Sequence, residues 1–208
     1  MFKEAISKKT LGALDLVINA KVLPSKTYLA GGTALAFQLG HRYSYDLDFF
    51  TNRRFDASNV IKKFKKIHGF KLEKTSWQTV LGYIDSIQCT LFFYQYPLLF
   101  PTHKFREANI ADIRDIAAMK IAAISDRGTK RDFIDFYFII NEAGITLKEA
   151  LNFYEKKFKV PEINRFHILK STVYFKDAEN QKMPRLIKEV NWIKVKKFFE
   201  NEVKKMIL

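Results

Sequence analysis

The order of apolar and polar residues divides the chain into two parts of different character. In the first part, helical periodicity alternates with short apolar or alternating runs, which are typical of strands. The expected elements are a helix at 1–20, a strand at 28–30, a helix from 34 to Gly40, a strand at 46–50, a helix at about 56–68 and strands at 70–77, 79–85 and 86–94. This order predicts a mixed α/β unit.

Helical spacing alone continues after Pro97 and Pro101. The expected helices cover roughly 112–126, 130–142, 146–157, 161–171 and 184–206. We therefore predict an α/β (α+β) fold in which an α/β domain at 1–100 is followed by a helical domain at 101–208. The lysine-rich last helix is expected to pack through an apolar face and to expose a basic one.

Composition narrows the class of protein. Of the 208 residues, 48% are hydrophobic and 20 are Phe, which excludes a predominantly disordered chain. The single cysteine, Cys89, excludes an internal disulfide and a thiolate metal cluster. The N-terminus lacks the uncharged core of a signal peptide, and no apolar stretch approaches the roughly 18 residues of a membrane span. We therefore expect a protein of the reducing cytoplasm without a membrane partner.

The charge balance favours an anionic partner. Lys and Arg number 36 against 22 Asp and Glu, giving a net charge of +14. Such an excess suits nucleic acid, a nucleotide or an acidic protein. A lysine-rich solvated surface is the alternative, and charge alone does not separate the two.

Asp46 and Asp48 carry the first chemical signal. Because they are two residues apart on an expected strand, both carboxylates project from the same face and repel each other. A divalent cation such as magnesium or manganese removes this repulsion and recruits triphosphate oxygens. An ordinary surface strand is the alternative for the pair taken alone.

A glycine turn precedes these acids. Gly31, Gly32 and Thr33 lie at the expected strand-to-helix turn, where backbone amides can approach a phosphate and the threonine hydroxyl can add a contact. An ordinary tight turn is the alternative. The stretch matches neither the dinucleotide-binding fingerprint nor the phosphate-binding loop that ends in Gly-Lys-Ser/Thr.

A lysine and two aspartates form the third signal. Lys120 stands in an otherwise apolar helix, so its burial requires an anionic partner, and its ammonium suits phosphate oxygens. Asp132 and Asp135 are three residues apart and share one face of the next helix. The alternative is a buried Lys–Asp bridge that joins the two helices.

Taken together, the stretches Leu29–Phe50 and Asp115–Tyr137 resemble the AbiEii/AbiGii nucleotidyltransferase toxins of the DNA polymerase β-like superfamily, which include the MenT toxins. The resemblance covers roughly residues 25 to 140. It implies a polymerase β-like mixed sheet with flanking helices, followed by a helical C-terminal part that completes the active site. The implied roles are magnesium binding for Asp46 and Asp48, nucleotide contacts for Gly31, Gly32, Thr33, Ser44 and Lys120, catalysis or orientation for Asp135, and support for Asp132.

Other charged residues flank these motifs. Arg42 is expected to contact the nucleotide and Arg131 to support the site, although isolated arginines are often simply solvated; the same holds for Arg127 and Lys130. His41 can serve as a base, but a packed histidine is the expectation.

The resemblance implies a magnesium-dependent enzyme that transfers a nucleotide from an NTP to an acceptor. The implied acceptor is the 3′ end of a tRNA or another RNA. The implied setting is the toxin of a type IV-like toxin–antitoxin or abortive-infection system, with a cognate antitoxin as protein partner. Two alternatives stay open: a transferase that acts on a protein or small molecule, and a non-catalytic nucleotide- or RNA-binding module.

One feature departs from the wider superfamily, in which a later strand often carries a third metal-binding acid. The expected strand at 86–92 offers Gln88 and Thr90 instead, and Asp85 precedes it in a turn. Either two strand acids and Asp135 suffice, as the resemblance implies, or the activity is weakened.

Overall fold

A single mixed sheet forms the centre of the molecule. The computed structural model describes residues 1–159 and 165–207. Within these residues, seven strands pair in the order β3-β4-β5-β2-β1-β7-β6. Their bounds are β1 Tyr28–Ala30, β2 Leu47–Thr51, β3 Phe70–Ser76, β4 Thr79–Ile84, β5 Ile87–Phe93, β6 His103–Phe105 and β7 Ala108–Ile110. β2 pairs with β1 in antiparallel and with β5 in parallel orientation, so the strand that carries the acids lies centrally.

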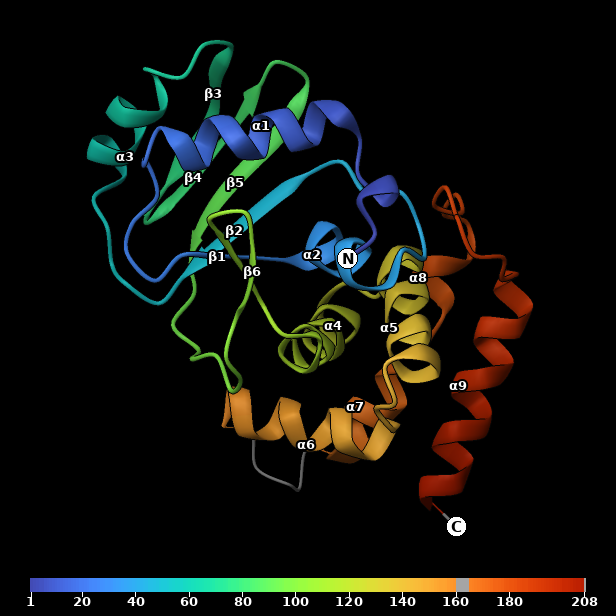
Figure 1. The fold of residues 1–208 in the computed structure, drawn as a ribbon. Coiled ribbons are helices and arrows are strands. Elements are labelled where there is room, and N and C mark those ends of the chain that lie inside the picture. The colour runs from blue at the N-terminus through green and yellow to red at the C-terminus, as the bar shows by residue number, and fades with distance from the viewer. Residues whose placement is uncertain (160–164, 208) are drawn as a thin grey trace.

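Helices cover both faces of this sheet (Figure 1). On one face lie α1 (Lys8–Asn19) and α3 (Ala57–Phe64), over the half formed by β3, β4 and β5. On the other lie α2 (Gly31–Leu39), α4 (Ile113–Asp126) and α6 (Leu147–Phe158), with α5 (Lys130–Glu142) packed beside α4. The predicted α/β fold class is confirmed.

The last helices complete the layer around α5. α7 (Arg165–Ser171) and the short α8 (Lys176–Glu179) precede the long α9 (Trp192–Ile207). α9 buries one apolar face through Val195, Phe199 and Val203, and the Phe199 ring stacks on Phe136 of α5 at 5.6 Å. The predicted packing helix is therefore confirmed.

The strands predicted at 28–30, 46–50, 70–77, 79–85 and 86–94 and the helices predicted at 112–126, 130–142 and 146–157 agree with the structure within two residues. The helix at about 56–68 is confirmed but ends earlier, at Phe64. Of the helix predicted at 161–171, residues 161–164 lie outside the described part of the chain, and α7 accounts for the rest.

The helix predicted from 34 to Gly40 is present but begins earlier, at Gly31, so the two glycines form its first turn. Two other helix predictions were wrong in extent at the N-terminal end. The helix expected over 1–20 begins only at Lys8, because Ser7 caps it by accepting a hydrogen bond from the Thr10 amide, and a 3₁₀ turn precedes it. The helix expected over 184–206 begins only at Trp192. The residues before it are extended because they pair with the loop ahead of β2: the Tyr43 amide donates to the Arg185 carbonyl at 2.9 Å.

Strands β6 and β7 were not anticipated. β7 pairs in parallel with β1 through Leu29 and Ile110, so the sheet continues beyond residue 100. Among the described residues, no helix is both long and apolar enough to cross a membrane.

Candidate active site

The two acids meet the glycine turn where β1 passes into α2. Ala30, the last residue of β1, pairs with Asp48 of β2. Gly31 has a φ of +70°, and a Cβ at this position would lie 3.0 Å from the Asp48 Oδ2 atom. The first amides of α2 have no acceptor within the helix. The turn therefore leaves space for a carboxylate and presents backbone donors beside it.

Two adjoining cavities open at this point. The first, called the polar cavity, has a volume of about 400 Å³, and the second, called the aromatic cavity, has about 440 Å³. The polar cavity is lined by Gly32, Arg42, Ser44, Asp46, Asp48, Leu81, Gln88, Thr90, Phe92, Lys120, Arg127, Thr129, Arg131 and Asp132. It shares Gly32, Asp48, Phe92, Lys120 and Arg127 with the aromatic cavity.

Asp48 is the electrostatically unusual residue of the pair. Burial and the nearby charge of Asp46 raise the pKa of the Asp48 carboxyl to about 6. Lys120 and two arginines oppose this rise without cancelling it. A carboxylate held in this way gains stability when a cation approaches.

The donor set fits a magnesium or manganese ion. Such ions are commonly held by one or two carboxylates together with substrate phosphates, and Asp46 and Asp48 line the same cavity beside the glycine turn. Thr90 of β5 pairs with Asp48, so the neighbouring strand contributes no acid there. Within residues 1–159 and 165–207, no group of three or more His, Cys, Asp or Glu side chains is placed to hold a metal.

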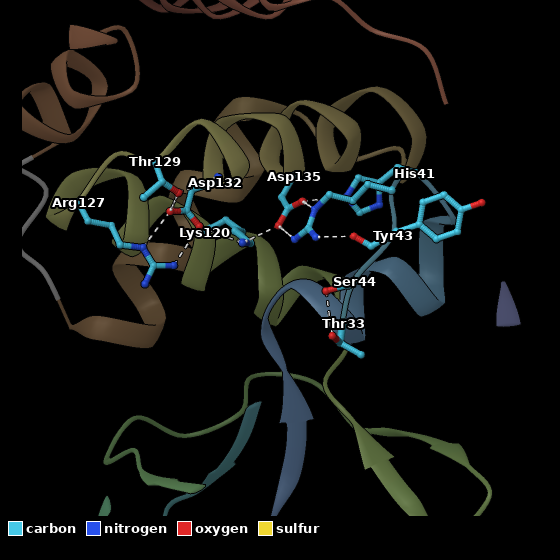
Figure 2. Close-up of polar contacts among 10 residues, drawn as sticks. Thr33, His41, Tyr43, Ser44, Lys120, Arg127, Thr129, Asp132 and Asp135 are labelled. Atoms are coloured by element: carbon cyan, nitrogen blue, oxygen red, sulfur yellow. Dashed lines mark hydrogen bonds and ion pairs between the residues drawn. The ribbon is translucent and has the colours of Figure 1, made fainter. Parts of the chain in front are cut away.

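Lys120 joins α4 to α5. Its Nζ atom lies 3.0 Å from Asp132 Oδ1 and 2.6 Å from Asp135 Oδ2 (Figure 2). The buried Lys–Asp bridge considered as an alternative is thus present. Lys120 also lines both cavities, so the bridge does not remove it from the site.

Asp135 lies behind the cavities rather than in their walls. The side chain is fully buried, and its oxygens accept hydrogen bonds from Arg42 Nε at 2.6 Å and Nη2 at 2.9 Å. Although burial opposes ionisation, the charges of Arg42 and Lys120 hold the pKa of Asp135 well below its ordinary value. Asp135 therefore orients two cations that do reach the polar cavity.

Gly32 is needed for this arrangement. A Cβ on Gly32 would lie 2.3 Å from Arg42 Nη2. The second glycine of the turn thus makes room for the arginine, as the first does for Asp48.

His41 is a packed histidine. Its Nε2 lies 2.8 Å from Asp135 Oδ1, and its ring packs against Phe138 at 5.1 Å. Burial lowers the pKa of His41, so the ring is neutral near neutral pH. The residue supports Asp135 and does not line either cavity.

Thr33 and Ser44 differ in their access to the site. The Thr33 hydroxyl is buried and donates to Ser44 Oγ at 2.9 Å and to the Asp46 carbonyl, so it holds α2 to the loop before β2. Ser44 lines the polar cavity, whereas Thr33 lines neither cavity.

The turn into α5 brings cationic groups to the cavities. Asp132 accepts hydrogen bonds from Arg127 Nε at 2.9 Å and from the Thr129 hydroxyl at 2.6 Å (Figure 2). Arg127 lines both cavities and Arg131 lines the polar one. Lys130 points elsewhere, because its Nζ donates to the Glu179 carbonyl.

Sequence reasoning missed the aromatic wall. Phe50 and Phe92 line the aromatic cavity beside Asp48. The signal was present in the two-residue period of a strand, which puts Phe50 on the face of Asp48 and Phe92 on the face of Thr90.

Known proteins similar to this chain include one sequence relative and several solved structures. Protein aq_aa25 of Aquifex aeolicus (strain VF5) is 35% identical over 206 residues, covering 97% of this chain and 98% of its own. Among solved structures, JHP933 of Helicobacter pylori has a TM-score of 0.56 at 19% identity, covering 97% of this chain and 95% of its own. MenT4, the nucleotidyltransferase toxin Rv2826c of Mycobacterium tuberculosis H37Rv, has a TM-score of 0.57 at 15% identity, covering 95% and 84%.

The two solved structures share the fold. A model of the family described as nucleotidyl transferase AbiEii toxin, type IV TA system, matches residues 14–99 and 87–205. This match spans most of the chain and includes both cavities. The chain therefore belongs to the AbiEii family of nucleotidyltransferase toxins.

Proposed function

We propose that this nucleotidyltransferase uses magnesium or manganese to transfer a nucleotide from an NTP to the 3′ end of an RNA, with tRNA as the acceptor. The observation that carries the proposal is that Asp46, Asp48, the glycine turn of α2 and Lys120 meet at one cavity. Together they supply what transfer to a phosphate requires: acids for a cation, backbone donors and a fixed positive charge.

Asp46 and Asp48 are the proposed metal ligands. When bound, the divalent cations supply charge stabilisation at the α-phosphate and at the leaving pyrophosphate. The remaining work is positioning, since an acceptor hydroxyl attacks efficiently only when it is held in line with the phosphorus atom and the leaving oxygen.

The other side chains divide into binding and positioning roles. Gly31 and Gly32 offer α2 amides, and Lys120 and Arg127 offer cations, to the triphosphate at the junction of the two cavities. Asp132 fixes both cations through its hydrogen bonds.

On the polar side, Ser44, Arg42 and Arg131 are proposed to contact the substrates. Asp135 is a positioning residue, because its oxygens are occupied by Arg42, His41 and Lys120. Thr33 is proposed to act through Ser44 and the Asp46 backbone.

A polyanionic acceptor fits the charge of the molecule. The net charge of +14 favours binding to RNA phosphates, and Arg131 is exposed at the edge of the polar cavity. Membership of a type IV toxin family supports a cognate antitoxin as partner. A cytoplasmic location is part of the same proposal.

The test is transfer with a defined set of acceptors. The protein is incubated with magnesium or manganese, each labelled NTP and total RNA, and the ends of tRNA are then sequenced. We expect labelled RNA with nucleotides added at 3′ ends. Asp46→Ala and Asp48→Ala are expected to abolish labelling, whereas Glu200→Gln, at an exposed acid of α9, retains it.

Three results would contradict parts of the proposal. If the label is found in protein or in a small molecule but not in RNA, the acceptor is not RNA. Full activity of both aspartate variants would refute the metal assignment. Absence of NTP binding in calorimetry with magnesium would favour a non-catalytic module.

A further inference from the structure

We propose that the aromatic cavity is the seat of the nucleobase of the donor nucleotide, which lies between the aromatic side chains of β2 and β5 and the apolar side chains of α4, and that the polar cavity receives the acceptor end. This inference rests on the proposed function and adds the direction in which the NTP lies. It also names the side chains that recognise the base.

The wall of the aromatic cavity continues directly from the catalytic acid. Along β2, Asp48 and Phe50 project from the same face, and along β5 the same face carries Thr90, Phe92 and then Tyr94 just beyond the strand. The Phe50 and Phe92 rings lie parallel within 26°, with centroids 5.2 Å apart. A nucleotide bound at Asp48 thus has aromatic, apolar side chains on one side.

Helices close the opposite side. α4 contributes Ile116, Met119 and Ala123, and Phe158 at the end of α6 contacts the Tyr94 ring edge-on at 6.4 Å. Only a few polar groups lie at this end of the cavity, so it suits the faces of a planar base better than it suits a phosphate. The volume of about 440 Å³ lies within the usual range for small-molecule sites.

The junction of the two cavities sets the orientation. Gly32, Asp48, Phe92, Lys120 and Arg127 belong to both cavities, and Gly32, Lys120 and Arg127 are the proposed triphosphate contacts. From that junction, one direction leads to aromatic rings and the other to Asp46, Gln88 and Arg131. The apolar base therefore suits the aromatic cavity and the charged acceptor strand suits the polar cavity, since burying a phosphate against phenyl rings would cost a large desolvation free energy.

The test separates the base from the phosphates by using two probes. Calorimetry with magnesium is performed with ATP, which has a base, and with inorganic tripolyphosphate, which has none. Base stacking on an aromatic side chain is worth roughly 1–3 kcal/mol, so Phe92→Ala is expected to weaken ATP binding by roughly 5- to 100-fold. Tripolyphosphate binding is expected to be unchanged.

Two further variants keep the test decisive. Ala123→Leu fills the aromatic cavity from α4 instead of emptying it, and we expect the same selective loss of ATP binding even if Phe92→Ala folds poorly. Phe93→Ala is the matched control, because Phe93 lies on the same strand but contacts Trp77 and lines neither cavity. Its affinities for both probes are expected to match those of the unmodified protein.

The outcomes distinguish this inference from the proposed function. Three outcomes would each overturn the base seat alone. The first is an equal loss of ATP and tripolyphosphate binding in Phe92→Ala, and the second is unaltered ATP binding in Ala123→Leu. The third is an unmodified protein that binds ATP no tighter than tripolyphosphate. An unmodified protein that binds neither probe would overturn the proposed function and the base seat with it.

Discussion

Replacing Asp48 by Asn is expected to stabilise the metal-free protein while it removes a proposed metal ligand. Burial and the charge of Asp46 make the ionised carboxylate unfavourable in the folded state, which is why its pKa lies near 6. A neutral amide of nearly the same shape avoids this cost. The ionised Asp48 carboxylate thus lowers the stability of the metal-free folded protein.

The magnitude follows from the pKa. A rise from 3.8 to about 6 corresponds to about 3 kcal/mol of unfolding free energy, since each pKa unit is worth ~1.4 kcal/mol. Below pH 3.8 the group is protonated in both states and costs nothing. Between pH 3.8 and about 6 the folded state keeps a proton that the unfolded state has lost, so stability falls as pH rises. Above about pH 6 the ionised carboxylate lowers the free energy of unfolding by the full amount.

The assay is urea unfolding in the presence of a chelator at several pH values. The advantage of Asp48→Asn is expected to grow through the interval from pH 3.8 to about 6 and then to stay constant. In a chain of this size, a difference of about 3 kcal/mol corresponds to roughly 6–12 °C in Tm. Glu200→Gln, which removes an exposed acid of α9, is the control and should show no such pH-dependent gain.

Magnesium provides the second arm of this experiment. It is expected to stabilise the unmodified protein and to leave Asp48→Asn unchanged, because a ligand that binds only the folded state raises stability. Equal stability of the two proteins above pH 6, or a gain that does not vary with pH, would refute the electrostatic reasoning.

Four further substitutions test individual contacts. Lys120→Met and Lys157→Met each remove the cation of a buried pair and are expected to cost about 3–5 kcal/mol in urea unfolding. Only Lys120→Met should also weaken tripolyphosphate binding. If both variants bind tripolyphosphate as the unmodified protein does, Lys120 has a purely structural role. Thr33→Val should cost about 1–3 kcal/mol in urea unfolding because it removes a buried hydroxyl that holds Ser44 and the Asp46 backbone. ATP affinity in calorimetry should fall less than in Lys120→Met, since Thr33 lines neither cavity; an equal loss would mean direct contact. Gly31→Ala should lower the free energy of unfolding by about 1–2 kcal/mol, because alanine is strained in the left-handed backbone conformation of Gly31. It should also bind magnesium more weakly, because the added Cβ meets Asp48; an unaltered magnesium titration would contradict this.

Local patterns predicted most elements of the fold but not all of them. The sequence predicted β1 to β5: β2 and β4 alternate buried and partly buried residues, β1 is a buried apolar run that ends at a glycine turn, and β3 is a mostly exposed strand between two turns. β6 and β7 have three residues each, too few to establish a period. Their place in the sheet depends on the pairing of Ile110 with Leu29, which lies far away in sequence.

The helix prediction for the segment from Pro184 to Asn191 was wrong for a related reason. Leu186, Ile187 and Val190 are spaced as in a helix, which led to the prediction of a helix. In the structure, the Ile187 and Lys188 amides donate to the His41 carbonyl instead. The backbone partner that prevents a helix here is a distant loop, and periodicity carries no information about it.

The candidate site divides in the same way. The shared face of Asp46 and Asp48 and the nearness of Gly31 follow from strand geometry and from the turn, so both were accessible from the sequence. The position of Asp135 was not, because its oxygens bind Arg42 only when α5 packs beside the loop that precedes β2. Spacing shows that Asp132 and Asp135 share a helical face but not which cations they meet.

Charge balance explains why these buried aspartates belong to the site. Among the described residues that line the polar cavity or contact its lining, Arg42, Lys120, Arg127 and Arg131 provide four cations, and Asp46, Asp48, Asp132 and Asp135 provide four acids. Asp132 and Asp135 pair with Arg42, Lys120 and Arg127, so Arg42 and Lys120 can be buried before any substrate arrives, whereas Arg127 stays exposed. Asp46 and Asp48 have no such partners in the hydrogen bonds of the described chain, and a bound cation is the partner that suits them. The fold thus places four cations, only partly neutralised by Asp132 and Asp135, beside an unpaired couple of acids, an arrangement in which metal and triphosphate stabilise each other's binding.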